Sequence, residues 1–123
     1  TAARELAERA LGVAQKAGLR EQEAQAYMTL GDVLSTSLHD EEATDAGVLS
    51  PAAIAFGAAI EVLANIGNEA VLAKALFVFG RYKAEIGDHA DAKDMLRDAL
   101  MMFSKLGLER PSSEVEKLLA SMN

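Results

Sequence analysis

Apolar residues recur along the chain at intervals of three and four, which is the spacing of one face of an α-helix. Three segments carry this stripe in the same register, and a glycine follows each of them. The stripes are Ala3, Leu6, Ala7, Ala10, Leu11 and Ala14 before Gly18; Ala52, Ala55, Phe56, Ala59, Ile60 and Leu63 before Gly67; and Ala92, Met95, Leu96, Ala99, Leu100 and Phe103 before Gly107. The second stripe lies 49 residues after the first and the third 40 residues after the second, so the pattern predicts a helical repeat.

A second type of helix alternates with these segments. We call the second type A and the glycine-terminated type B, so the order along the chain is B, A, B, A, B. The residues that define type A are Ala24, Tyr27, Leu30, Gly31 and Leu34 in one copy and Ala73, Leu76, Phe79, Gly80 and Lys83 in the next. Because Gly31, Gly80, Ala59 and Ala99 are small, we expect neighbouring helices to approach closely there.

Turn and capping residues set the expected helix ends. Gly18, Gly67 and Gly107 are expected to stop the B helices, Asp88 to cap a helix after Gly87, and Ser50 to cap one that begins at Pro51. Pro111 is expected to end the preceding segment, and Ser113 with Glu116 forms a capping-box pattern for a last helix that covers the final repeat. The predicted helices cover residues 2–17, 21–36, 51–66, 69–86, 89–106 and 113–122, with an inserted loop over 37–49.

No stretch shows the alternation of a β-strand, so the sequence predicts an all-α protein that forms one domain over residues 1–123. The A and B residues resemble the tetratricopeptide repeat, a helix-turn-helix unit. Its A helix matches Tyr27, Leu30, Gly31 and Leu34, and again Leu76, Phe79 and Gly80; its B helix matches Ala92, Leu96 and Ala99, and also Ala52, Phe56 and Ala59. Lys83 stands where the family has an apolar residue, and the closing proline of the family is absent.

The resemblance implies antiparallel helix pairs stacked as a short right-handed superhelix, with about two and a half repeats and a C-terminal capping helix. The spacing of 40 residues is similar to the extended repeats of kinesin light chains and of bacterial regulatory proteins. Since the first B helix has no A partner before it, we also expect the chain to be a piece of a longer repeat protein.

Composition narrows the function classes. The 123 residues carry 12 Lys and Arg against 19 Asp and Glu, a formal net charge of −7, which argues against nucleic acid or an anionic membrane as the partner. There is no cysteine, and the longest apolar stretch, from Val48 to Ile60, is too short to span a bilayer. The first ten residues carry four charges and do not resemble a signal peptide, so we expect a cytoplasmic protein.

Catalytic chemistry finds no support in the sequence. The two histidines are His39, beside Asp40, Glu41 and Glu42 in the inserted loop, and His89, next to a helix cap. The acidic loop lacks the ligand spacing and central glycine of a calcium-binding EF-hand, and we interpret it as a solvated loop. The sequence therefore predicts no enzyme, no catalytic residue, no metal site and no cofactor.

The resemblance implies that ligand contacts come from helix-A positions beside the packing residues. Carried over by position, the predicted groove residues are Gln25, Met28, Asp32 and Ser35 in the first A helix and Lys74, Phe77 and Arg81 in the second. The alternative is structural: Phe77 packs against a neighbouring helix and Arg81 pairs with Asp32. Because Met28 and Asp32 replace the Lys and Asn of co-chaperone repeats, the carboxylate clamp of those repeats is not expected.

Two functions remain open at this point. The first is a non-enzymatic protein-interaction module, an adaptor or scaffold in signalling, that holds a peptide or protein in its groove. The second is a structural or self-association segment of a larger signalling or transcriptional regulator, in which the uncovered face of the first helix forms a homodimer. That face carries Ala3, Leu6, Ala10 and Leu11.

Overall fold

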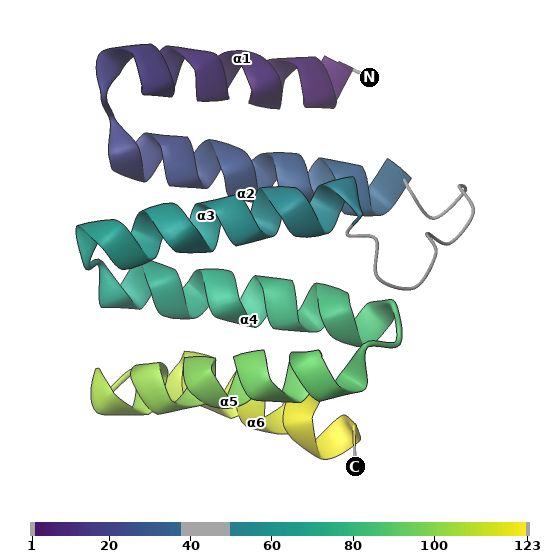
Figure 1. Cartoon of the computed structure of the whole chain (residues 1–123). Coiled ribbons are helices and arrows are strands. Elements are labelled where there is room, and N and C mark those ends of the chain that lie inside the picture. The colour runs from purple at the N-terminus through teal and green to yellow at the C-terminus, as the bar shows by residue number, and fades with distance from the viewer. Residues whose placement is uncertain (1, 38–49, 123) are drawn as a thin grey trace. The chain divides into compact units, whose positions relative to one another are not determined.

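The computed structural model describes residues 2–37 and 50–122, and in these ranges the chain is all-helical (Figure 1). The described residues form six helices: α1 (Ala2–Ala17), α2 (Arg20–Ser37), α3 (Pro51–Ile66), α4 (Glu69–Glu85), α5 (His89–Lys105) and α6 (Glu109–Ser121). The all-α prediction is confirmed, and the packing of successive helices is compatible with a helical repeat. Ser37 is the last residue of α2, and the rest of the predicted loop, residues 38–49, lies outside the described residues.

The chain divides into two compact units, and each is described by itself. Unit 1 covers residues 1–66 and unit 2 covers residues 67–123. In unit 1, α2 packs against both α1 and α3; in unit 2, α5 packs against both α4 and α6. Each unit is therefore a set of three helices in which consecutive helices are neighbours (Figure 1).

Glycines in the left-handed backbone region end four of the helices, as the pattern predicts for three of them. Gly18, Gly67 and Gly107 have φ values of 71°, 76° and 74°, and Gly87 has a φ of 91°. A side chain would strain this conformation, whereas glycine adopts it readily. After Gly18 the Leu19 N–H donates to the Ala14 carbonyl at 2.9 Å, the backbone bond of a Schellman motif. The reversal after each B helix is therefore encoded in a single residue.

Side chains cap the starts of α3 and α5 as predicted. The Ala53 N–H donates to the Ser50 hydroxyl at 3.1 Å, one residue before Pro51 opens α3. The Asp91 N–H donates to Asp88 Oδ1 at 3.4 Å at the start of α5. Each cap satisfies a backbone donor that the first helical turn leaves without a partner.

The predicted start of the last helix is wrong. Helix α6 begins at Glu109, four residues before the expected Ser113, and its N-cap Leu108 makes no side-chain hydrogen bond. Pro111 does not stop a helix; it lies in the first turn of α6, where a missing N–H costs nothing. Ser113 and Glu116 lie inside the helix and form no cap. Gly107 and Leu108 repeat the positions of Gly18 and Leu19, so α6 starts as α2 does.

Close packing of A on B helices rests on two glycines, one in each unit. A Cβ atom added to Gly31 of α2 would lie 2.5 Å from Cε1 of Phe56 in α3. One added to Gly80 of α4 would lie 2.9 Å from Cγ of Leu96 in α5. Such distances are well inside van der Waals contact, so the expected close approach at these two positions is confirmed.

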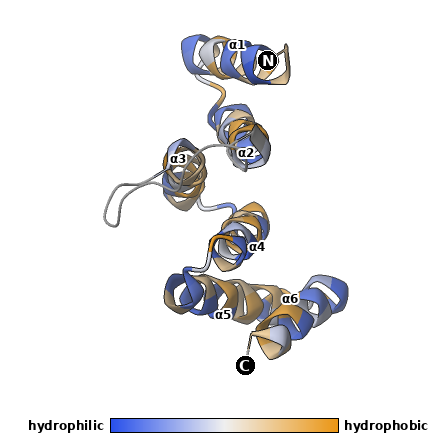
Figure 2. Cartoon of the chain, turned by 90° about the vertical axis from the view of Figure 1, so that its right-hand side faces the viewer, coloured by the Kyte–Doolittle hydropathy of each residue, from blue (hydrophilic) through white to orange (hydrophobic). Residues whose placement is uncertain are grey.

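The apolar stripes of α3 and α5, the second and third B helices, lie in the cores of the two units. Ala52, Phe56, Ala59 and Leu63 of α3 are almost fully buried. In unit 2, one cluster joins three helices: Ala73 of α4, Leu96, Ala99 and Phe103 of α5, and Val115 of α6. Figure 2 shows that each helix carries both hydrophobic and hydrophilic residues. Within the described residues no helix combines the length and apolarity that a membrane span needs.

Candidate functional site

The four predicted groove residues of unit 1 lie on α2 at intervals that place them on one helix face. Gln25 and Asp32 are exposed, and Met28 and Ser35 are half-buried. The Ser35 hydroxyl donates to the Asp32 carbonyl oxygen at 2.8 Å, so it is turned back onto its own helix. Met28 is the apolar member of this row, and Gln25 and Asp32 are its polar members.

The three predicted residues of unit 2 form a second row on α4, which we call the α4 row: Lys74, Phe77 and Arg81. Lys74 and Arg81 are exposed, and Phe77 is half-buried. The guanidinium carbon of Arg81 lies 5.6 Å from the centre of the Phe77 ring, a cation–π arrangement. The row therefore presents two cations and one aromatic ring on a chain of net charge −7.

Phe77 also packs against the core cluster of unit 2. The alternative in which Phe77 packs against a neighbouring helix is therefore correct in part, because its ring contacts the core cluster. The same ring also stacks with the guanidinium group of Arg81. The stacking orients a guanidinium that would otherwise move freely, which lowers the entropy that the side chain loses when it contacts a ligand.

A third candidate surface lies between α1 and the start of α2. Leu6, Val13 and Leu19 are 63%, 61% and 47% exposed, and with Arg9, Ala10 and Gln22 they line a groove of about 400 Å³. We call it the α1–α2 groove. Of the predicted uncovered stripe, Ala3, Leu6 and Ala10 are exposed and Leu11 is half-buried. The stripe indicated this surface, but it did not include Val13 or Leu19.

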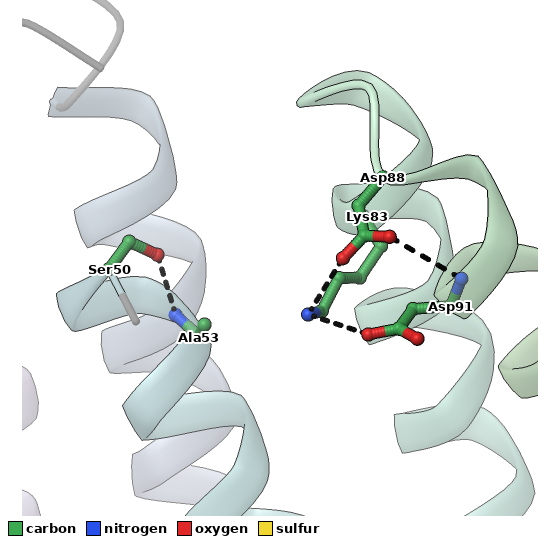
Figure 3. A network of polar contacts seen from close by, with 5 residues as sticks. All are labelled: Ser50, Ala53, Lys83, Asp88 and Asp91. Carbon is green, nitrogen blue, oxygen red and sulfur yellow. Dashed lines mark hydrogen bonds and ion pairs between the residues drawn. The ribbon is translucent and has the colours of Figure 1, made fainter. Parts of the chain in front are cut away.

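A buried lysine joins the end of α4 to the start of α5 (Figure 3). Lys83 is only 7% exposed; its Nζ lies 3.3 Å from Asp88 Oδ2 and 3.4 Å from Asp91 Oδ2. The ammonium group also lies 5.4 Å from the centre of the Phe79 ring. Two carboxylates and an aromatic face thus replace the water that this ammonium group loses on burial. We call Lys83, Asp88 and Asp91 the lysine network.

The network shifts the pKa of Asp88. Partial burial tends to raise the pKa of this carboxyl group, but the hydrogen bonds from Lys83 and from the backbone N–H of Asp91 outweigh that effect and lower the pKa. A carboxyl group whose pKa is lower in the folded state stabilises the fold above its unfolded pKa and loses that contribution as the pH falls through the folded pKa.

We therefore expect acid to weaken this network. The stability difference between the wild-type chain and an Asp88→Asn variant, which keeps a capping oxygen, should be constant near neutral pH and shrink below the ordinary aspartate pKa. Urea unfolding followed by circular dichroism at several pH values measures the difference. A difference that stays the same down to the acid limit would contradict this account of Asp88.

Other sequence observations have plainer outcomes. Met101, which lies outside the apolar stripe, is 65% exposed, whereas Met102 and Met122 pack against the core of unit 2. His39 and its acidic neighbours lie outside the described residues. Among the residues that the structure describes, no group of three or more His, Cys, Asp or Glu side chains could hold a metal ion.

Comparison with known proteins identifies no relative. No protein-family model, curated protein or solved structure matches the chain. The function proposed below therefore rests on the surfaces described above and on the repeat pattern.

Proposed function

We propose that the chain is a non-enzymatic protein-interaction module, of tetratricopeptide-repeat type, that binds a peptide or protein partner on the exposed faces of its A helices. The α4 row carries this proposal. Its two cations stand seven residues apart on one helix, about 10 Å along the axis, with the Phe77 ring between them. Cations beside a stacked aromatic ring suit a ligand with carboxylates and an apolar group.

The repeated helices also support a binding role. The repeated A and B helices present side chains on rigid elements, as repeat proteins do when they bind other proteins. We propose the cytoplasm as its setting, and a role as an adaptor or scaffold in signalling. Gln25, Met28, Asp32 and Ser35 are proposed to form the corresponding surface of unit 1.

Charge reversal on α4 tests the proposal. We expect a Lys74→Glu/Arg81→Glu variant to retain each wild-type partner about tenfold less in quantitative affinity capture from cell extract, because the two attractive contacts become repulsive. An Arg110→Glu/Lys117→Glu variant is the matched control, since these exposed cations on α6 have the same spacing and change the net charge equally. If all three proteins capture the same partners equally, the α4 row is not the binding surface.

A structural or self-association segment of a larger signalling or transcriptional regulator is the second candidate. The exposed apolar residues Leu6 and Val13 on α1 favour it, because such residues are usually covered. This candidate requires that the chain forms oligomers as its concentration rises. Light scattering that gives a constant monomer mass over a wide concentration range would argue against it.

A further inference from the structure

We draw no further inference here: the strongest candidate, the α1–α2 groove with its exposed apolar residues Leu6, Val13 and Leu19, carries nothing because nothing in the part of the chain that the structure describes shows what covers it.

Discussion

Substituting Gly31 by valine is expected to lower the free energy of unfolding by about 3 kcal/mol, because the added side chain overlaps the Phe56 ring. A Cβ atom alone would lie 2.5, 2.6 and 2.8 Å from three atoms of that ring. The ring is almost completely buried, so it has no free space into which it can move. Urea unfolding followed by circular dichroism at 222 nm measures the change.

Gly57 provides a matched control for this effect. It lies inside α3, and a Cβ atom added there meets nothing within 4 Å. Gly57→Ala should therefore stabilise the chain by about 0.5–1 kcal/mol through helix propensity, whereas Gly31→Ala should destabilise it. A Phe56→Leu substitution should recover part of the stability that Gly31→Val loses. If alanine has the same effect at both glycines, the close contact between α2 and α3 does not limit stability.

Local sequence patterns predicted most of this fold because local physics determines most of it. The glycines at 18, 67 and 107 end helices through their own backbone freedom, and Asp88 caps α5 through an atom three residues from its donor. The wrong start of α6 shows the limit of such patterns. Ser113 and Glu116 have the spacing of a capping box, but Gly107 and Leu108 reverse the chain earlier, as Gly18 and Leu19 do. For the start of α6, the repeat register therefore predicts the structure better than the capping-box pattern does.

The candidate surfaces were only partly predictable. Spacing along the helix placed Phe77 and Arg81 on one face, where four residues of separation allows their stacking. The role of Lys83 was not predictable, since its position in the repeat indicated only that an apolar residue had been replaced. Its burial depends on where the Gly87 turn brings Asp88 and Asp91, which is a tertiary property. In the same way, the exposure of Val13 depends on which helices pack against α1.

An Asp88→Asn/Asp91→Asn variant is expected to lose about 2 kcal/mol of unfolding free energy, because it leaves the buried ammonium of Lys83 without a charged partner. The side chain of Lys83 is 9% exposed, whereas those of Asp88 and Asp91 are 41% and 57% exposed. An unpaired charge therefore costs more unfolding free energy when it is that of the buried lysine than when it is that of either exposed carboxylate. Asparagine keeps an oxygen that can accept the Asp91 backbone N–H, so the loss of charge is separated from the loss of the cap.

The same asymmetry predicts the opposite behaviour for the lysine. Lys83→Met keeps the length of a buried side chain and leaves two carboxylates that water still reaches, so its effect should stay within about 1 kcal/mol of zero. Adding Lys83→Met to the Asp88→Asn/Asp91→Asn variant should restore most of the lost stability, since the unpaired charge is then gone. A double-mutant cycle from urea unfolding measures this coupling. If the losses simply add, the ammonium group is not held by these carboxylates, and the apolar stem of Lys83 and its Phe79 contact account for its burial.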